Sequence, residues 1–416
     1  MDVTDYRRRP ARAPAVLVLA VLVLAVLFIA ASCSSTGASG SPGTVATTDP
    51  TTTVTTPGVS TTQPPAATDT TQDAPTTVST ATPESTSTLS PLEPPTFESL
   101  EGINTITDFS GLTSGGSNRW QQSVPGVEDI RITSTADGAD QPALWLAPGD
   151  DGKRPLLVIL HSWSSGYLQH AGIPYAMWAQ ENGWAVIAPQ FRGVNDDPDA
   201  IGSDLAVQDV ADAIDYATSQ DGVDADRVYA VGYSGGGMMS LLLAGRHPDK
   251  VTAVAAWGPP YDLVEFYRQS AATGRHYAGD LRAGCGGDPT DGGSAREECV
   301  RRSPMTYLDT AREQGVPVFI GQGIFDSLLS PRHGATAFNQ LADPEDRLSD
   351  GQVDEIGQGS IPEEITEPIS TETFFGEGDP APVFARRSGS AWLVLFGADH
   401  DMVYHATLRW LASDPR

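Results

Sequence analysis

The stretch that decides the fold is VYAVGYSGG, residues 228–236, which is followed at once by a helix-forming run from Met238 to Ala244. A short apolar strand, a serine between glycines and then a helix form the context that a nucleophile elbow requires. The turn of such an elbow is too tight for side chains beside the serine, so glycine must flank it. The sequence therefore predicts that Ser234 sits on a sharp strand-to-helix turn and is a candidate nucleophile.

Two later apolar strands end in loops that supply partners for this serine. A serine hydroxyl is a poor nucleophile alone, so it needs a base within hydrogen-bond distance and a third group that orients the base. In open α/β sheets of this kind the partners follow in the order serine, acid, histidine. Val316–Ile320 runs into Asp326, and Ala391–Phe396 runs into His400. We therefore predict a triad of Ser234, Asp326 and His400.

Five other histidines are weaker candidates for the catalytic base than His400. His247 closes the helix after the elbow, and the dipole at a helix C-terminus stabilises a positive or dipolar side chain there. His405 lies inside the last helix. Three others lie in polar stretches, where we expect solvated side chains: His170, His276 and His333. The alternative, a metal site of His400, His405 and neighbouring aspartates, lacks the ligand spacing of zinc sites. We expect no metal and no cofactor.

Acyl transfer also requires two N–H groups aimed at the developing oxyanion. One is expected from Gly235, the residue after the nucleophile. The second is expected from the loop HSWSSG, residues 161–166, which follows the apolar strand Leu156–Leu160. We assign Trp163 as this donor. Ser162 is the alternative donor, because the common form of the loop has glycine at that position. A further alternative is that the loop supplies no donor and is a turn that packs over the site.

Several motifs beyond the triad are typical of one family. They are APQFRG (188–193), VQDVADAIDY (207–216), DRV (226–228), RSP (302–304) and GIFD (323–326). With these motifs the region from Val127 to Arg416 resembles the α/β-hydrolases of the prolyl oligopeptidase type. The resemblance implies a serine hydrolase that cleaves peptides or esters through an acyl-enzyme. Low-complexity sequence stands before this domain, so we expect no β-propeller of the kind that usually precedes it. This favours a stand-alone hydrolase or esterase, although a peptidase remains natural by homology.

The pattern of apolar runs predicts an α/β-hydrolase fold with a mostly parallel eight-stranded sheet and helices on both faces. A hairpin (Glu128 to Ala147) precedes six strands: Leu156 to Leu160, Trp184 to Ala188, Val228 to Val231, Val251 to Trp257, Val316 to Ile320 and Ala391 to Phe396. The catalytic domain is expected at 127–416, with a lid at about 259–304. The acidic block at about 343–377 is expected to be a solvated insertion, or alternatively a rim that selects substrates.

The N-terminus predicts export. Arginines at positions 7, 8, 9 and 12 precede an apolar run from Ala13 to Ala31, and Cys33 follows in small residues. This is the pattern of a signal sequence over residues 1–33. The context of Cys33 resembles a bacterial lipoprotein cleavage site, which implies a lipidated Cys33. The alternatives are an uncleaved membrane anchor and soluble secretion. All three place the domain outside the cytoplasm.

The segment that follows has the composition of a tether. Between Ser34 and Leu100 there is no Lys or Arg, and Thr, Ser, Pro and Ala dominate. Such a segment buries too little apolar surface to offset the entropy cost of ordering. We therefore expect residues 34–126 to form a disordered tether and lead-in to the catalytic domain.

Two cysteines remain if Cys33 is lipidated. Cys285 and Cys299 lie within the expected lid, and disulfides persist in an oxidising compartment, so we predict a bridge between them. Free thiols are the alternative. We derive no oligomeric state.

Net charge excludes one class of partner. At −28 the chain lacks the Lys and Arg clusters that bind phosphate backbones, so nucleic acid is not expected as a partner. The expected partners are a small peptide or ester substrate and, through the N-terminal lipid or helix, a membrane. Two functions remain, an exported serine hydrolase and a tethered binding protein without catalysis. An inactive relative is expected to lack a triad member, whereas Ser234, Asp326 and His400 are all present here.

Overall fold

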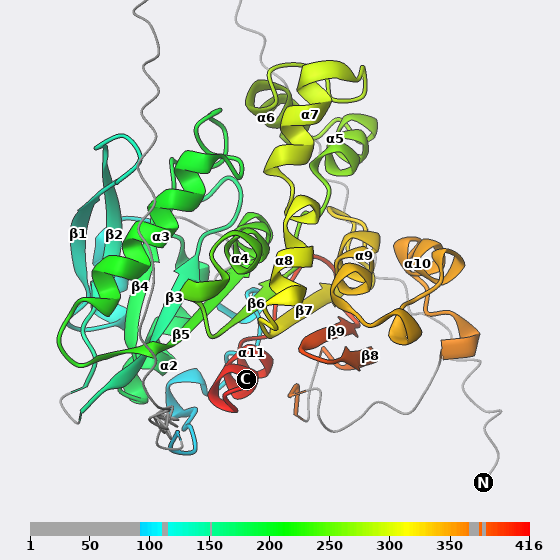
Figure 1. The fold of residues 1–416 in the computed structure, drawn as a ribbon. Helices are drawn as coiled ribbons and strands as arrows, with labels where there is room; N and C mark the ends of the chain where they lie inside the picture. Colours follow the sequence, from blue (N-terminus) through cyan, green and yellow to red (C-terminus); the bar gives the residue numbers. More distant parts are fainter. Residues whose placement is uncertain (1–91, 110–114, 150–151, 366–373, 377–379) are drawn as a thin grey trace, which may run out of the picture. The chain divides into compact units, whose positions relative to one another are not determined.

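A mostly parallel β-sheet organises the computed structural model, which describes residues 92–109, 115–149, 152–365, 374–376 and 380–416. Within these residues the sheet has nine strands in the order β1-β2-β4-β3-β5-β6-β7-β9-β8 (Figure 1). The strands are β1 Glu128–Thr133, β2 Asp140–Leu146, β3 Arg154–Leu160, β4 Ala185–Pro189, β5 Val223–Tyr233, β6 Ala253–Trp257, β7 Val318–Gly323, β8 Pro382–Ser388 and β9 Ala391–Phe396. The pairs β1/β2, β2/β4 and β8/β9 are antiparallel, and all other neighbours are parallel.

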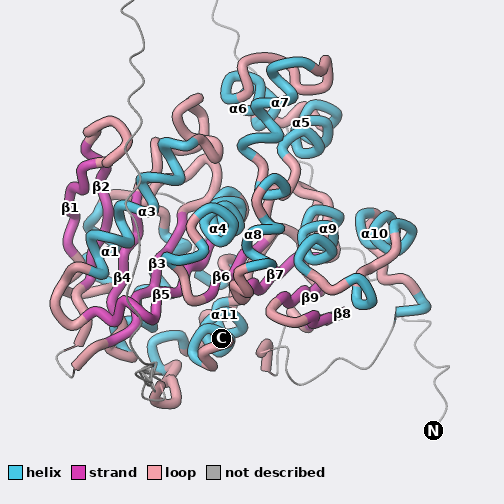
Figure 2. Tube along the Cα trace, viewed as in Figure 1, coloured by secondary structure: helices cyan, strands magenta, loops and turns pink. Residues whose placement is uncertain are grey.

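Helices cover both faces of the sheet (Figure 2). They are α1 Ser117–Ser123, α2 Ile173–Glu181, α3 Asp204–Thr218, α4 Gly235–Arg246, α5 Leu263–Ala272, α6 Tyr277–Gly284, α7 Gly293–Arg302, α8 Leu308–Glu313, α9 Arg332–Leu341, α10 Asp350–Gly357 and α11 Tyr404–Ala412. Residues of α3, α4, α8 and α9 share one core, and residues of α1, α2 and α11 share the other. Leu156 and Val158 of β3 join the first core while Leu157 and Ile159 join the second, because strand side chains alternate between faces. The α/β-hydrolase fold is thus confirmed.

The predicted strand count was wrong by one. The missed strand is β8, which pairs antiparallel with β9 from Pro382 opposite Phe396 to Ser388 opposite Ala391. It lies at the edge of the sheet, where only one side is paired. Edge strands carry charges and proline that central strands avoid, and here Arg386 and Arg387 interrupt any apolar run. The pattern of apolar residues therefore missed it.

The predicted boundary at residue 126 was also wrong. The lead-in, defined here as residues 92–109 and 115–126, packs into the core shared by α2 and α11, and Leu100, Trp120 and Val124 are 0% exposed. Thr105 also pairs with Val403 in an isolated β-bridge. A few large apolar side chains suffice to dock such a segment, although its average composition is polar. Residues 34–91 and the signal at 1–33 lie outside the described residues.

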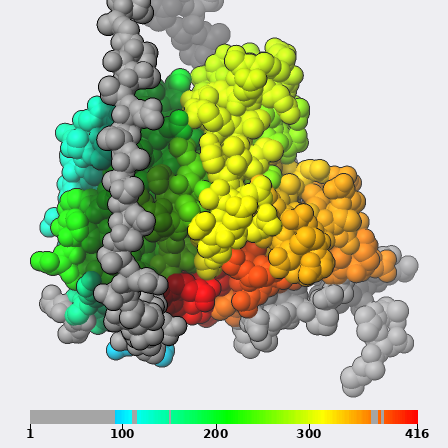
Figure 3. Space-filling view, viewed as in Figure 1, coloured from blue at the N-terminus to red at the C-terminus, as the bar shows by residue number. Residues whose placement is uncertain are grey.

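Helices α5, α6 and α7 occupy the segment after β6 that was predicted to be a lid. We call residues 259–304, which contain α5, α6 and α7, the cap; they form a lobe at the top of the view in Figure 3. Cys285 at the end of α6 and Cys299 in α7 are joined by a disulfide, and both residues are buried. The bridge closes the two ends of the α6–α7 connection, so the cap carries its own covalent cross-link.

The acidic block is partly built into the core, which corrects the expectation of a purely solvated insertion. Residues 343–365 contain α10, and Leu348, Val353 and Ile356 are buried in the core shared by α9. Ser330 Oγ donates to Gly357 O at 2.9 Å, which fixes the end of α10 beside the loop after β7. Residues 366–373 of the block lie outside the described part of the chain.

The predicted signal or anchor lies outside the described residues. No helix in the described ranges is both long and apolar enough to cross a membrane. The apolar run from Ala13 to Ala31 falls outside those ranges, so its role stays a prediction.

Candidate active site

Ser234 stands between β5, which ends at Tyr233, and α4, which begins at Gly235. Its backbone has φ 55° and ψ −117°, a conformation that is strained for any residue with a side chain. The turn is so tight that a Cβ on Gly232 would lie 2.1 Å from Gly236 O, and only glycine avoids this clash. The backbone thus has the geometry of a nucleophile elbow.

Asp326 and His400 meet at the same edge of the sheet. Asp326 follows β7 and His400 follows β9, which are neighbouring parallel strands. His400 Nδ1 lies 2.5 Å from Asp326 Oδ2, and the Asp326 side chain is almost completely buried. A carboxylate only accepts hydrogen bonds, so the proton of the neutral imidazole is assigned to Nδ1. Nε2 is then the free acceptor.

Further hydrogen bonds hold the Asp326 carboxylate in place. Oδ1 accepts from the backbone N–H groups of Leu328 and Leu329 at 2.9 and 2.8 Å. Oδ2 also accepts from Gln322 Nε2 at 2.9 Å. The sequence analysis did not identify Gln322, although a glutamine inside an otherwise apolar strand was a signal that it has a buried polar partner.

Two neighbours of Ser234 contact His400. Ser234 N donates to Trp257 O at 2.7 Å, and the next residue, Gly258, is so close to His400 that a Cβ there would lie 3.0 Å from Cε1. From the other side Tyr233 Oη donates to His400 O at 2.8 Å. His400 Nε2 is buried and has no hydrogen-bond partner within the described ranges. The nitrogen that a base would use is therefore desolvated and unengaged.

Burial controls the protonation of Tyr233. Desolvation raises its pKa well above the ordinary value, and the nearby carboxylates of Asp326 and Asp401 act in the same direction. Tyr233 therefore stays protonated and serves as a permanent donor to the His400 backbone.

The backbone N–H groups of the two candidate oxyanion donors differ in their contacts. The backbone of Gly235 lies against that of Trp163, since a Cβ on Gly235 would be 2.6 Å from Trp163 N. Ser162 N is already engaged with Gln169 Oε1 at 2.9 Å. Among the described residues Trp163 N–H has no acceptor. Trp163 is therefore the free donor beside the elbow.

Two histidines that were expected to be solvated are buried instead. His333 Nδ1 accepts from Tyr261 N at 3.1 Å, and burial lowers the pKa of His333 to about 4. His170 is also buried, whereas His276 is exposed as expected. Local polarity misled the prediction, because burial depends on elements that pack from elsewhere in the chain. The described part of the chain contains no cluster of His, Cys, Asp or Glu suited to a metal ion.

The lead-in holds the loop that carries His400, which the sequence analysis missed. Asp401, the next residue, accepts from Ile106 N at 3.0 Å and from Thr107 Oγ1 at 2.8 Å. Tyr404 N donates to Asn104 O at 2.9 Å. These contacts join residues about three hundred positions apart, so no local pattern could have shown them.

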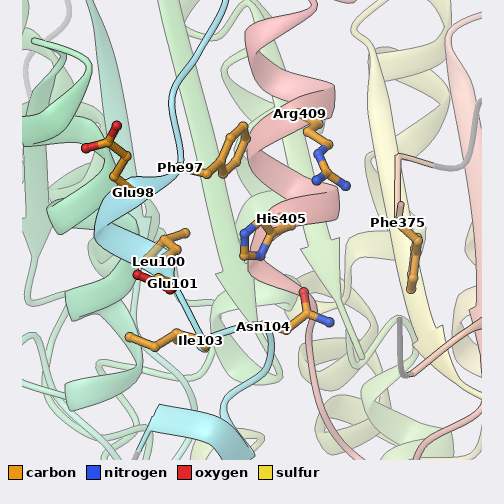
Figure 4. Close-up of a pocket in the computed structure, with 10 residues that line it drawn as sticks. Phe97, Glu98, Leu100, Glu101, Ile103, Asn104, Phe375, His405 and Arg409 are labelled. Carbon is orange, nitrogen blue, oxygen red and sulfur yellow. The ribbon is translucent and has the colours of Figure 1, made fainter. Parts of the chain in front are cut away.

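A surface pocket of about 710 Å³ lies between the lead-in and α11 (Figure 4). Its lining residues are Phe97, Glu98, Leu100, Glu101, Gly102, Ile103, Asn104, Phe375, His405 and Arg409. His405 packs flat against Phe97 there, with ring centroids 5.1 Å apart. No member of the predicted triad lines this pocket, so the candidate active site rests on the triad geometry and not on the pocket.

Comparisons with known proteins agree with the fold. A family model described as the alpha/beta hydrolase fold matches residues 155–286. The chain is 33% identical over 123 residues to the Nocardia uniformis subsp. tsuyamanensis protein NocK, which bears the name of an esterase, across 26% of this chain and 34% of that protein. It is 30% identical over 143 residues to acylamino-acid-releasing enzyme 1 of Oryza sativa subsp. japonica, across 31% and 18%. It is 30% identical over 115 residues to feruloyl esterase B of Thermothelomyces thermophilus, across 26% and 40%.

Each of these matches spans well under half of the relative's own length. Among solved structures, the acylaminoacyl peptidase of Pyrococcus horikoshii superposes with a TM-score of 0.44 at 15% identity, over 55% of this chain and 37% of that one. A puromycin-hydrolyzing peptidase of Mycobacterium tuberculosis superposes with a TM-score of 0.39 at 18% identity, over 52% and 34%. The curated relatives that the chain matches bear the names of esterases and of an acylamino-acid-releasing enzyme.

Proposed function

We propose that the protein is an extracytoplasmic serine hydrolase of the prolyl oligopeptidase type that cleaves peptide or ester bonds through an acyl-enzyme. One observation carries this proposal: a strained serine elbow lies beside a histidine whose Nδ1 is bound to a buried aspartate and whose Nε2 is unengaged. This arrangement supports a catalytic triad, in which the base takes the proton of the nucleophile and the acid orients the base.

In the first half of the reaction Ser234 Oγ attacks the substrate carbonyl carbon while His400 Nε2 takes the hydroxyl proton. Asp326 stabilises the imidazolium that forms, because Nδ1–H already donates to its Oδ2. Collapse of the tetrahedral intermediate breaks the bond to the leaving group, which leaves with the proton from His400. The acyl group then remains on Ser234 as an ester.

In the second half a water molecule replaces the leaving group. His400 Nε2 takes a proton from this water as it attacks the acyl carbon, and the same proton returns to Ser234 Oγ when the ester bond breaks. The carboxylic acid product dissociates and the enzyme returns to its starting state. No cofactor is needed for this sequence.

The backbone N–H groups of Gly235 and Trp163 are proposed to bind the oxyanion in both intermediates. Donors of this kind are effective because they are already oriented before charge develops. The free N–H of Trp163 beside Gly235 supports this assignment.

The proposed mechanism applies to peptide bonds and to ester bonds alike. The similar proteins include both esterases and an acylamino-acid-releasing enzyme. Carboxylesterase activity is therefore the alternative to peptidase activity. A binding protein without catalysis is disfavoured, because a relaxed backbone would serve it as well as the strained conformation at Ser234.

The experiment uses the chain from Leu92 to Arg416, which keeps the lead-in, and its Ser234→Ala variant. We expect a fluorophosphonate probe to label the wild type and not the variant, and kcat to fall at least about a thousandfold in the variant. Short-chain p-nitrophenyl esters and proline-containing amides, assayed side by side, assign the bond class. A wild type that neither reacts with the probe nor turns over any of these substrates contradicts catalysis and favours the binding protein.

Export is proposed from the N-terminal sequence alone. A signal sequence ending at Cys33 accounts for the basic residues, the apolar run and the small residues around the cysteine. The full chain expressed in a bacterial host is expected to incorporate labelled palmitate and to fractionate with membranes. A Cys33→Ala variant that still incorporates palmitate contradicts lipidation at this residue. A wild type that takes up no palmitate but still fractionates with membranes indicates the uncleaved anchor.

A further inference from the structure

Helix α6 of the cap contacts the loop that carries the proposed oxyanion donor. Trp163 Nε1 donates to Asp280 Oδ2 at 3.0 Å. The next residue of that loop, Ser164, places its Oγ 2.9 Å from His276 Nε2. Asp280 and His276 are four residues apart, on one face of the helix. One turn of the cap therefore binds two consecutive residues of the loop.

The Trp163 indole is held by the cap on several sides. The residue is 4% exposed, and its ring makes edge-to-face contacts with Phe266 of α5 and Tyr277 of α6 at centroid distances of 5.6 and 5.9 Å. Aromatic packing excludes water but leaves a ring free to slide. The hydrogen bond to Asp280 sets the direction of the ring, and a carboxylate acceptor makes that bond a strong one.

The same short segment of the cap also reaches the loop that carries Asp326. Arg275 Nη2 donates to Ser327 O at 2.9 Å, one residue after the proposed catalytic acid. Residues 275–280 therefore bridge the acid loop and the oxyanion loop. A displacement of this segment would change the separation of the two loops.

We propose that Asp280 is a positioning residue, through which the cap holds the Trp163 backbone N–H in line with the oxyanion. This inference rests on the proposed function. The ring and the N–H belong to the same residue, so an anchored ring restricts the backbone torsions that aim the donor. Asp280 touches neither substrate nor reacting atoms in this account; it acts through Trp163.

A misplaced oxyanion donor has a specific kinetic signature. The donor binds charge that exists only in the transition state, so its loss lowers kcat and leaves KM nearly unchanged. Displacement of reacting groups by about 1 Å can cost up to about a hundredfold in rate. We expect a smaller effect here, because the aromatic contacts of Trp163 remain when Asp280 is removed.

The test compares Asp280→Ala, Asp280→Asn, Trp163→Phe and the double variant Trp163→Phe/Asp280→Ala in the full chain. Asp280→Ala should lower kcat about tenfold with KM within about twofold of the wild type. Asp280→Asn keeps an acceptor oxygen and should recover most of the activity. Trp163→Phe keeps the backbone N–H but lacks Nε1–H, so it should match Asp280→Ala, and the double variant should be no slower than the slower single variant.

A matched control breaks a hydrogen bond that stays inside the cap. Tyr267 Oη donates to Asp288 Oδ2 at 2.5 Å, away from the oxyanion loop. Tyr267→Phe should leave kcat and KM at wild-type values. A tenfold loss of kcat in this control would show that any disturbance of the cap slows the reaction, which overturns the specific role of Asp280.

The remaining outcomes separate this inference from the proposed function. A wild type that reacts with a fluorophosphonate while Asp280→Ala keeps full kcat overturns the role of Asp280 alone. A raised KM with unchanged kcat in Asp280→Ala assigns Asp280 to substrate binding instead. Additive losses of kcat in the double variant show that Asp280 and the Trp163 ring act independently. If Asp280→Ala does not fold, Trp163→Phe decides: it should be about tenfold slower than the wild type, whereas Asp280→Asn should keep most of the activity. A wild type without labelling overturns both proposals.

Discussion

The lead-in and the cap both support a loop of the candidate site, but they do so by different means. The lead-in is built into the core, with Leu100 and Trp120 fully buried, and reaches the His400 loop through Asp401. The cap carries its own disulfide and reaches the oxyanion loop through polar side chains of α6. The comparison teaches that both segments join a core, the cap through residues such as Leu263 and Phe266, but that the lead-in contacts its loop largely through backbone groups and the cap contacts its loop through polar side chains.

Removal of the lead-in should have the largest effect. A chain that begins at Val127 lacks Leu100, Trp120 and Val124, and it exposes the apolar surface that they cover. Loss of a single buried tryptophan side chain typically costs about 3–5 kcal/mol, so the shortened chain should be unfolded or insoluble. Urea unfolding measures this against the chain that begins at Leu92. Equal midpoints for the two chains would show that the lead-in is dispensable for folding, which contradicts its role as a support built into the core.

Loss of the cap disulfide should rank second. Cys285 and Cys299 are 14 residues apart, and a loop of this size corresponds to about 3 kcal/mol in the chain-entropy account. The variant Cys285→Ser/Cys299→Ser should therefore melt earlier than the wild type, and dithiothreitol should no longer change its melting temperature. A wild type whose melting temperature does not respond to the reductant contradicts a stabilising bridge.

Acidification should weaken the attachment of the cap through His333. Its Nδ1 accepts from Tyr261 N where the cap leaves β6, and burial lowers its pKa to about 4, although the carboxylates of Asp262 and Glu265 oppose this shift. The unfolded chain binds a proton below about pH 6.5 and the folded chain does not, so stability falls as the pH drops from 6.5 towards 4. The loss attributable to His333 should be about 2 kcal/mol at pH 5.

The His333→Gln variant tests whether His333 causes the loss of stability at low pH. Glutamine can still accept from Tyr261 N but does not titrate, so the difference in unfolding free energy between pH 7.5 and pH 5 should shrink relative to the wild type. Urea unfolding at both pH values gives the two differences. An unchanged pH dependence would show that His333 is not the group that couples the cap to pH.

The smallest effect is expected from Asp401. Its carboxylate accepts from Ile106 N, Thr107 Oγ1 and Met402 N, so Asp401→Ala leaves these donors without their acceptor. We expect a loss of about 1–2 kcal/mol in unfolding free energy and about a threefold drop in kcat, because the His400 loop is less well held. Asp401→Asn keeps an acceptor and serves as the control. A tenfold drop of kcat without loss of stability would instead place Asp401 in the catalytic machinery.

Local chain order allowed much of the candidate site to be predicted. Glycines around Ser234 are required by the turn itself, and Asp326 and His400 each follow a recognisable buried strand. In a parallel sheet such strand ends meet at one edge, so their proximity follows from topology alone. The disulfide pair and the cap were likewise visible as a cysteine pair within an insertion.

Other features were missed because they depend on packing between distant segments. Strand β8 has no apolar run, and the lead-in resembles the polar tether that precedes it. The burial of His333 is set by the segment around Tyr261, far away in the chain. Composition averages over neighbours in sequence, whereas burial depends on neighbours in space.

The sequence by itself therefore determined the α/β-hydrolase fold, the elbow at Ser234 and the order in which its predicted partners occur. These follow from sterics at glycine and from alternating strand and helix patterns, which act over a few residues. Only the tertiary structure decided that the lead-in holds the His400 loop and that Asp280 contacts Trp163 across 117 positions of the chain. Such contacts form when separate elements dock on the same core, and no local pattern encodes which polar side chains then meet.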